Sequence, residues 1–334
     1  MLGESESPLS DGYDLAMFDL DGVVYVGGTA IDGVPERVDR LVAAGVHVAF
    51  VTNNASRTAA EVAENLLKLG VHASAEDVVT SAQAAARVLH DRFGTGASIL
   101  LLGGAGLVGA LGDLGLVPVT DLETPDVAAI VSGFGPEVRW KDVMRAAVLI
   151  RDGLPWVASN ADMTFPTAYG LAPGHGVLVK TLADFSGVQP VVAGKPARPL
   201  LDETIRRVGG ERPLMVGDRL DTDIEGARNA GVDSLLVMTG VTGLLELLAA
   251  TPELRPTYIS PTTEGLFEPH PAPRMDAGAA SLNGWTASVV DGRLTVVGGG
   301  SPADWWRVVA VAAWQHLDTT GSPADTSGLS TPGA

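Results

Sequence analysis

The sequence predicts an α/β protein built around a parallel sheet. Short apolar runs alternate with alanine- and leucine-rich segments of helical length, which is typical of parallel strands joined by crossover helices. Polar residues gather directly behind several of the apolar runs, where the crevice of an open parallel sheet lies. The segments lack the eightfold regularity of a barrel, so an open, Rossmann-like sheet is expected.

The expected elements follow the apolar and helical patterns in chain order. Strands are predicted over Leu15–Phe18, Val46–Thr52, Ser98–Leu102, Ala128–Ser132, Pro155–Ser159, Val191–Val192, Leu214–Val216 and Ser234–Met238. Helices are predicted over Pro35–Ala44, Ala59–Leu69, Ala82–Phe93, Trp140–Asp152, Val177–Ser186, Arg198–Val208 and Thr222–Ala230.

Composition restricts the function classes. The 334 residues include 40 acidic and 22 basic ones, a net charge of -18, which argues against nucleic acid or anionic lipid as a partner. There is no cysteine, so thiol chemistry and disulfides are excluded. The first residues lack the basic, apolar start of a secretory signal, and no apolar run reaches the roughly 20 residues that span a bilayer. We therefore expect a cytoplasmic protein without membrane insertion.

The C-terminal part differs in composition from the rest. Residues 261–280 are rich in Pro, Gly, Ala and Thr, and this indicates a linker. A hairpin is predicted from Thr286–Val290 and Arg293–Val297 around an Asp-Gly turn, followed by a helix over Ala303–Leu317 and a disordered tail over 318–334. With no catalytic motif in it, this part is interpreted as a small docking subdomain.

The first motif that carries chemistry directly follows the strand Leu15–Phe18. Asp19 and Asp21 lie at the carboxyl end of that strand, and Gly22 permits a tight turn behind them. Two carboxylates separated by one residue can share a hard cation while one attacks phosphorus and the other moves a proton. On its own, Asp-Leu-Asp-Gly is also compatible with an ordinary turn.

Further motifs follow other strands. Thr52, Asn53 and Asn54 offer a hydroxyl and amides for phosphate oxygens, although the same residues commonly cap a helix. Lys195 stands between a glycine and a proline behind the strand Val191–Val192, as a fixed cation in an acidic chain.

An acidic loop follows the strand Leu214–Val216. Asp218, Asp221 and Asp223 lie within six residues there, and their spacing does not fit an EF-hand. Four strand ends with complementary chemistry indicate one active site and not four separate turns.

In these four motifs and their order the chain resembles the haloacid dehalogenase superfamily, in particular its NagD-like and 4-nitrophenylphosphatase-like phosphatases, over about residues 12–260. The resemblance implies a magnesium-dependent phosphatase with Asp19 as nucleophile and Asp21 as acid and base. Magnesium would be bound by Asp19, by the backbone carbonyl of Asp21 and by Asp218. Asp223 would support the site, and the phosphoryl group would be held by the residues Thr52, Asn53, Asn54 and Lys195.

The resemblance also implies an inserted α/β cap domain. We place the cap over residues 82–186, the catalytic core over 1–81 and 187–262, and the appendage over 263–334. Asn160 and Asp162 would lie in a cap loop that contributes to substrate binding. Dimers formed through the cap are common in this branch, so a homo-oligomer is compatible with the resemblance.

The implied substrate is a small phosphorylated metabolite, with glycerol 3-phosphate as first choice. The cap loop around Ala168 and Tyr169 offers no cation for a second anionic group and no aromatic pair to stack a base. Phosphoglycolate, sugar phosphates, nucleotides and pyridoxal phosphate are the alternatives.

A competing interpretation comes from Gly104–Gly109, which match the Gly-x-Gly-x-x-Gly motif of nicotinamide-dependent oxidoreductases, with Asp121 near the usual distance of a ribose-binding acid. That interpretation leaves Asp19, Asp21 and Lys195 without a role, and the motif alone is a weak signal.

Overall fold

A computed structural model of the chain describes residues 2–121, 123–167 and 170–332, with the backbone alone described at 165–167. The chain forms two compact units. The first unit comprises Met1–Val48, Leu69–His72 and Gly210–Ala334, and the second unit comprises Ala49–Lys68 and Ala73–Gly209. The core, cap and appendage boundaries expected from the sequence stay a prediction.

The first unit is built on parallel strands in the order β15-β14-β13-β1. These strands are β1 (Leu15–Phe18), β13 (Pro213–Gly217), β14 (Asp233–Val237) and β15 (Tyr258–Ser260). All of β1 and β15 is buried, as is all but the first residue of β13 and β14. Strands covered on both faces require such continuous apolar runs, which is why three of the four could be predicted from the sequence.

Helices and short turns connect these strands. They are α1 (Leu9–Gly12), α2 (Val34–Ala43), the π-helical turn η2 (Leu220–Ile224), α9 (Glu225–Ala230), α10 (Leu244–Leu248), η3 (Pro252–Leu254) and η4 (Thr263–Phe267), with a small hairpin of β2 (Tyr25–Val26) and β3 (Thr29–Ala30). The helix predicted over Thr222–Ala230 thus begins as a π turn and becomes α-helical only at Glu225.

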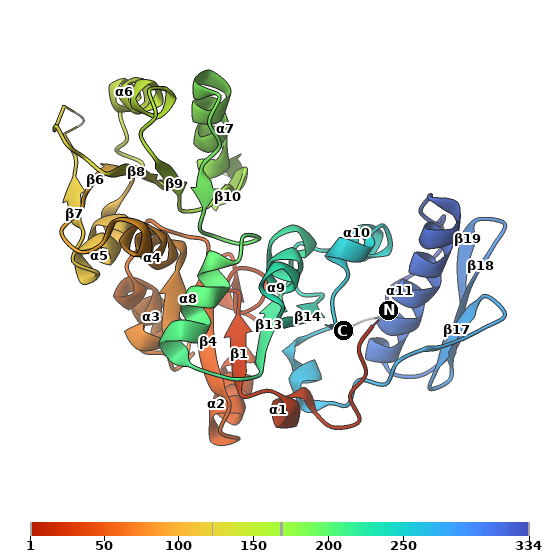
Figure 1. Cartoon of the computed structure of the whole chain (residues 1–334). Coiled ribbons are helices and arrows are strands. Elements are labelled where there is room, and N and C mark those ends of the chain that lie inside the picture. The colour runs from red at the N-terminus through yellow and green to blue at the C-terminus, as the bar shows by residue number, and fades with distance from the viewer. Residues whose placement is uncertain (1, 122, 168–169, 333–334) are drawn as a thin grey trace. The chain divides into compact units, whose positions relative to one another are not determined.

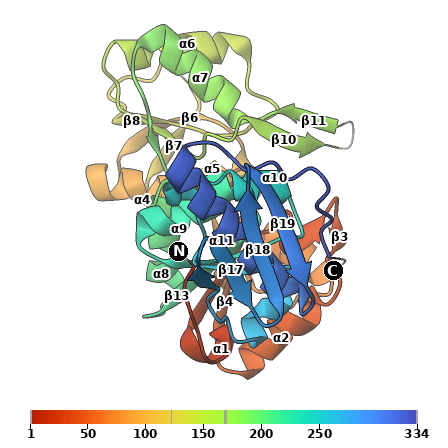
Figure 2. The ribbon, with the colours of Figure 1, turned by 90° about the vertical axis from the view of Figure 1, so that its right-hand side faces the viewer.

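The C-terminal part of the first unit is an antiparallel sheet covered by one long helix (Figure 2). The elements are β16 (Arg274–Asp276), β17 (Ala279–Leu282), β18 (Trp285–Val290), β19 (Arg293–Gly298) and α11 (Pro302–Thr320). The predicted hairpin is confirmed, because Val290 pairs with Arg293 and both residues of the Asp291-Gly292 turn have positive φ.

The linker predicted over 261–280 is wrong, because this segment contains η4, β16 and the start of β17. Ala277 and Gly278 form a second tight hairpin turn, both with positive φ, and Ala280 is buried under α11. The small residues that resemble a linker in composition are therefore turn residues and close-packed strand residues.

The predicted disorder of the tail also differs from the structure, over the part described through Pro332. The helix α11 continues to Thr320, and Gly321 ends it in the left-handed conformation. Beyond it, the Asp325 N–H donates to the Gly292 carbonyl and the Leu294 N–H donates to the Asp325 carbonyl, at 2.8 and 2.9 Å. Residues 333 and 334 lie outside the described residues.

The helix α11 is buried on all sides over residues 303–314. Its tryptophans Trp305, Trp306 and Trp314 share one apolar cluster with Leu247 of α10 and Ile259 of β15. The Trp314 indole N–H donates to the Leu247 carbonyl at 2.8 Å. A helix that is buried on every side belongs inside a protein, so α11 is a core helix of the first unit and not a surface attachment.

A polar network inside this unit joins α11 to the segment after β15. The Arg307 guanidinium bonds to the Ile259 carbonyl, to Asp304 and to His270 Nδ1, the last at 3.1 Å. His270 Nε2 lies 2.7 Å from the Gly265 carbonyl. Because Arg307 can only donate and the carbonyl can only accept, the imidazole is held in the neutral tautomer with its hydrogen on Nε2.

The second unit contains two groups of parallel strands. One pair consists of β4 (His47–Thr52), which begins at the unit boundary, and β5 (Val78–Thr80). Around this pair lie α3 (Ala59–Lys68), η1 (Ala75–Asp77), α4 (Ser81–Phe93) and α8 (Pro199–Val208).

A five-stranded parallel sheet in the order β12-β9-β8-β6-β7 forms the rest of the second unit, with α6 and α7 side by side against it (Figure 1). Its elements are β6 (Ser98–Leu102), α5 (Ala105–Asp113), β7 (Val117–Val119), β8 (Ala129–Ser132), α6 (Trp140–Arg151), β9 (Trp156–Ala158), α7 (His175–Ser186) and β12 (Val191–Val192). An antiparallel hairpin pairs β10 (Thr164–Thr167) with β11 (Gly170–Pro173). The strand β12 pairs with β9, although the sequence analysis assigns it to the core.

The glycine-rich segment Gly104–Gly109 forms the start of α5. There the Gly106 N–H donates to the Ser56 carbonyl at 3.3 Å, and a side chain at Gly106 would collide with the carbonyl oxygens of Ala55 and Arg57. Backbone of the same unit thus lies against the helix start where a pyrophosphate would bind in an oxidoreductase. The glycine serves close packing, and the dinucleotide interpretation loses its basis.

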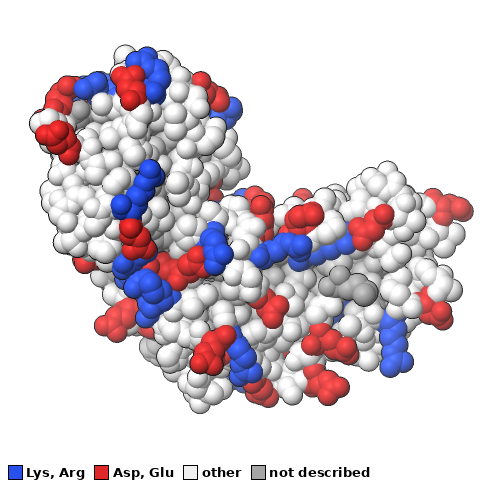
Figure 3. All heavy atoms as spheres, in the orientation of Figure 1, with Lys and Arg blue, Asp and Glu red and all other residues white. Residues whose placement is uncertain are grey.

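The surface does not show a broad basic area on the face in Figure 3, where acidic and basic side chains alternate among uncharged ones. Within the described residues, every helix is too short or too polar to cross a membrane.

The neutral state of His270 predicts a pH-dependent stability. Burial, with the nearby Arg307 charge, lowers the pKa of His270 from 6.5 to about 4. The unfolded chain therefore binds a proton that the folded chain does not, and stability falls as pH falls from 6.5 towards 4. Between pH 7 and 5 we expect a loss of about 2 kcal/mol from this residue.

The measurement is urea unfolding of the wild type and of His270→Gln at pH 7, 6 and 5. Glutamine keeps an N–H for the Gly265 carbonyl but does not titrate. Its stability should decline less with acid, while His175, whose pKa burial also lowers to about 4, contributes equally to both proteins. Equal declines would show that His270 is not held neutral.

Candidate active site

The nucleophile loop of the first unit continues directly from β1. The Asp19 N–H donates to the Val216 carbonyl of β13 at 2.9 Å, so the loop starts in register with the neighbouring strand. The Leu20 carbonyl then accepts the N–H groups of Val23, Val24 and Tyr25, which closes a tight turn. Within this turn Gly22 has a φ of +87°, and a side chain there would collide with the Asp218 carboxylate. The turn thus requires glycine, as the sequence predicts.

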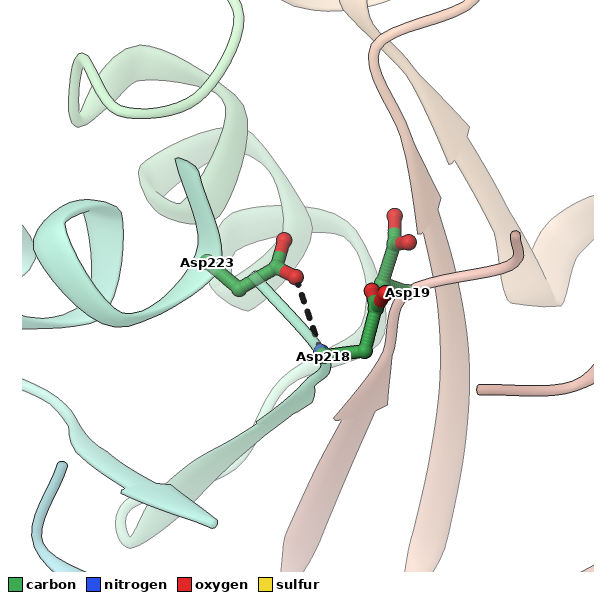
Figure 4. Close-up of side chains that lie close together, drawn as sticks. All are labelled: Asp19, Asp218 and Asp223. Atoms are coloured by element: carbon green, nitrogen blue, oxygen red, sulfur yellow. Dashed lines mark hydrogen bonds between the residues drawn. The ribbon is translucent and has the colours of Figure 1, made fainter. Parts of the chain in front are cut away.

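The acidic loop follows β13 in the same unit. Asp218 and Asp223 are fully buried. One Asp223 oxygen accepts the backbone N–H of Asp218 at 3.1 Å (Figure 4), and the same oxygen accepts the backbone N–H of Arg219, also at 3.1 Å. Asp221 points outward, and the hydrogen bond from Arg219 lowers the pKa of its carboxyl group. The loop therefore separates two inward carboxylates from an outward ion pair.

Three carboxylates meet at this end of the sheet. Asp19, Asp218 and Asp223 each offer an oxygen, and these oxygens lie within 4.8 Å of one another. Carboxylate oxygens gathered at such distances suit a hard divalent cation, which offsets their mutual repulsion. The exposed side chain of Asp21 is outside this cluster, which is compatible with the expected role of its backbone carbonyl.

A further loop, which the sequence analysis missed, holds Asp218 from the end of β14. The Val241 N–H donates to Asp218 Oδ2 at 2.7 Å, and the Thr242 N–H donates to the Asp218 carbonyl at 3.1 Å. Thr239 donates its hydroxyl to the Gly22 carbonyl at 2.6 Å, and Gly240 has no room for a side chain beside the Asp218 carboxylate. Its position in the sequence could have revealed this loop, because it follows the predicted strand Ser234–Met238 and so lies at the same edge of the sheet as the Asp19 loop and the acidic loop.

The second unit contains the other predicted site residues. The side chain of Asn53 bonds to both the backbone N–H and the carbonyl of Lys195, at 2.8 and 2.9 Å, and to Asp162 Oδ1 at 3.0 Å. Asn160 donates to the Asn53 carbonyl at 2.8 Å. Four of the predicted residues are thus brought together around one amide, and Lys195 is only 2% exposed.

The remaining two residues of that set form local turns. Thr52 Oγ1 accepts the Asn54 N–H at 3.1 Å, and Asn54 Oδ1 accepts the N–H and hydroxyl of Ser56 at 2.9 and 2.7 Å. The side chain of Asn54 therefore shapes the chain between β4 and α3. The roles assigned to all of these residues stay predictions.

A parallel sheet with carboxylates at the ends of β1 and β13 defines the class of protein: an α/β enzyme whose chemistry is carried by aspartates. Two family models match the chain. The model described as haloacid dehalogenase-like hydrolase covers residues 16–117, and a HAD-hydrolase-like model covers residues 192–266. Together the matched segments include both the Asp19 loop and the acidic loop.

Named relatives point to the same family as the two family models. The chain is 40% identical over 317 residues to the D-glycerol 3-phosphate phosphatase of Mycobacterium tuberculosis, covering 92% of this chain and 87% of that protein. Among solved structures, the glycerol phosphate phosphatase of M. tuberculosis in complex with magnesium matches with a TM-score of 0.84 and 39% identity over 92% of each chain. The 4-nitrophenylphosphatase of Thermotoga maritima matches with a TM-score of 0.69 and 31% identity, covering 76% of this chain and 96% of that one.

The chain belongs to the haloacid dehalogenase family, and within it to the phosphatases. This confirms the family, the fold class and the enzyme class expected from the four sequence motifs.

The contacts of the β14 loop predict that Gly240→Ala weakens binding of a divalent cation. A methyl group at this position would meet the Asp218 carboxylate and displace it from the cluster. Disturbing a group that orients a metal ligand typically lowers affinity by roughly 10- to 100-fold. Isothermal titration calorimetry with Mg²⁺ measures the effect directly, without substrate.

The matched control is Gly12→Ala, since a side chain at Gly12 would have no neighbour within 4 Å. It should bind the cation as the wild type does. If Gly240→Ala also binds normally, the β14 loop does not orient Asp218.

Proposed function

We propose that this chain hydrolyses a small phosphate monoester in two steps, with Asp19 as the nucleophile. The observation that carries the proposal is the cluster of Asp19, Asp218 and Asp223 at the ends of two parallel strands. In a family of aspartate-based hydrolases, a carboxylate directly behind a buried strand is the group that faces the crevice.

The donors of this cluster fit magnesium. Hard divalent cations take oxygen ligands, and the three carboxylates supply them within 4.8 Å of one another. We assign the ion to Asp19, the backbone carbonyl of Asp21 and Asp218, with Asp223 fixing the loop that carries Asp218. When bound, magnesium supplies positive charge that neutralises the transferring phosphoryl group. The magnesium-bound relative supports this assignment.

In the first step a carboxylate oxygen of Asp19 bonds to phosphorus while the bond from phosphorus to the ester oxygen breaks. Asp21 gives its proton to the leaving oxygen, so the alcohol departs neutral. The exposed position of the Asp21 side chain at the turn supports a role in proton exchange. We assign Thr52 and Lys195 to the phosphoryl oxygens, where a fixed cation and a hydroxyl stabilise negative charge.

In the second step Asp21, now a carboxylate, takes a proton from water. The water oxygen bonds to phosphorus, and the bond from phosphorus to Asp19 breaks. Phosphate leaves, Asp19 regains its carboxylate, and Asp21 is protonated for the next cycle. Atoms and charges balance with water as the only co-reactant.

For the substrate we propose glycerol 3-phosphate. The support is the similarity to the M. tuberculosis D-glycerol 3-phosphate phosphatase over 92% of this chain. The cap loop that favoured a small, neutral leaving group in the sequence includes Ala168 and Tyr169, which lie outside the described residues. Phosphoglycolate, sugar phosphates, nucleotides and pyridoxal phosphate are the competing substrates for a test. We further propose that the enzyme acts in the cytoplasm and that copies of this chain can associate into a homo-oligomer.

Asp19→Asn is expected to lower kcat by roughly four orders of magnitude, because the amide is a poor nucleophile. Release of inorganic phosphate from glycerol 3-phosphate measures turnover. Asp221→Asn is the matched control, since Asp221 points outward in an ion pair with Arg219 and should keep its activity. Substantial turnover by Asp19→Asn would contradict the mechanism.

A screen of phosphate monoesters tests the substrate. Glycerol 3-phosphate should give the highest kcat/KM, and excess chelator should abolish turnover of every ester, with recovery on adding Mg²⁺. Strong activity on another ester with failure on glycerol 3-phosphate would redirect the substrate while leaving the reaction class intact.

A further inference from the structure

We infer that Asn53 is a positioning residue, which holds Lys195 and Asp162 in one fixed arrangement and does not bind the phosphoryl group with its side chain. The inference rests on the proposed phosphatase function and refines the expected role of Asn53 as a phosphate ligand. Its basis is that both amide hydrogens and the amide oxygen of Asn53 already form hydrogen bonds within the protein.

A side-chain amide offers two N–H hydrogens and one carbonyl oxygen. In Asn53, Nδ2 donates to the Lys195 carbonyl at 2.9 Å and to Asp162 Oδ1 at 3.0 Å, while Oδ1 accepts the Lys195 N–H at 2.8 Å. The partners fix which atom is nitrogen, because a backbone N–H can only donate and a carbonyl can only accept. Both amide hydrogens are engaged, so neither is available to a phosphate oxygen.

The two bonds to Lys195 hold its peptide N–H and its carbonyl at once. The lysine is 2% exposed, and at the preceding Gly194 a side chain would meet Asn53 Oδ1 and the Ser159 carbonyl. The backbone of residues 194 and 195 is therefore held closely against the Asn53 side chain. Because the side chain starts from this clamped backbone, the amide sets where the ammonium group can reach.

The third bond extends the clamp to Asp162. The Asp162 N–H donates to Asn160 Oδ1 at 3.2 Å, and Asn160 in turn donates to the Asn53 carbonyl at 2.8 Å. The Asp162 carbonyl accepts the Gly176 N–H at the start of α7. Two segments that are distant in sequence thus share one amide, so a change at Asn53 should disturb both together.

A double-mutant cycle distinguishes positioning from direct phosphate binding. We expect Asn53→Ala to lower kcat/KM by roughly 30-fold or more and to raise the inhibition constant of inorganic phosphate, as Lys195→Ala does. The double variant should lose clearly less than the product of the two single losses, because the lysine that Asn53 positions is already absent in the Lys195→Ala background. Losses that multiply would show that Asn53 acts independently and would overturn the inference.

An exchange of charges tests the link to Asp162. Asn53→Asp removes both donated hydrogens and places a carboxylate beside Asp162, so it should be the most damaging single change at position 53. Adding Asp162→Asn restores a hydrogen bond between the two side chains, now with the amide of residue 162 as donor and the carboxylate of residue 53 as acceptor. This double variant should recover activity by roughly tenfold relative to Asn53→Asp alone. If Asn53→Asp lowers activity by the same factor with aspartate or with asparagine at position 162, Asn53 does not act through Asp162.

Ser81→Ala serves as the matched control for a loosened fold. Ser81 donates its hydroxyl to the Asn53 carbonyl at 2.6 Å, and its removal leaves the three side-chain bonds of Asn53 in place. The melting temperature should fall, but the inhibition constant of phosphate should stay within about twofold of the wild type. If Ser81→Ala raised the inhibition constant of phosphate as much as Asn53→Ala does, the effect would come from a general loosening of the fold and not from the loss of the Asn53 side-chain bonds. A wild type without turnover on any ester would instead contradict the proposed function.

Discussion

The register between β1 and β13 is the constraint on which the carboxylate cluster depends. The hydrogen bond from Asp19 N–H to the Val216 carbonyl places the ends of both strands at the same level. A shift by one residue would turn every side chain of β1 to the other face of the sheet. The buried residues on both faces of these strands therefore fix the distance between Asp19 and Asp218, and their packing provides the energy that holds like charges together.

Much of this arrangement could be predicted because it depends on local sequence. Strands buried on both faces must be apolar, and polar residues at their carboxyl ends stand out, as Asp19, Thr52 and Asp218 do. The glycine of the Asp19 turn was predictable from the tight turn alone, whereas its close approach to Asp218 is a tertiary contact. Strand ends therefore reveal which residues face the crevice. The residues that form hydrogen bonds with them are determined by tertiary contacts, which the local sequence does not show.

The unpredicted features depend on such contacts. The Thr239–Thr242 loop contains no charged or amide side chain, and the backbone N–H groups with which it orients Asp218 carry no sequence signature. The amide of Asn53 could equally cap a helix, and its use on Lys195 depends on residues 142 positions later. β16 and β17 were missed because they are short and their turns and small residues resemble a linker.

The burial of α11 over residues 303–314 has a consequence for how the protein is made. The tryptophans of this helix close an apolar surface that Leu247, Ile259 and neighbouring residues leave open in the preceding chain. Proteins are synthesised from the N-terminus, and domains generally fold as whole units during synthesis. The first unit therefore cannot complete its core until α11 has left the ribosome, so the strands that carry Asp19 and Asp218 reach their final packing only after that helix has been made.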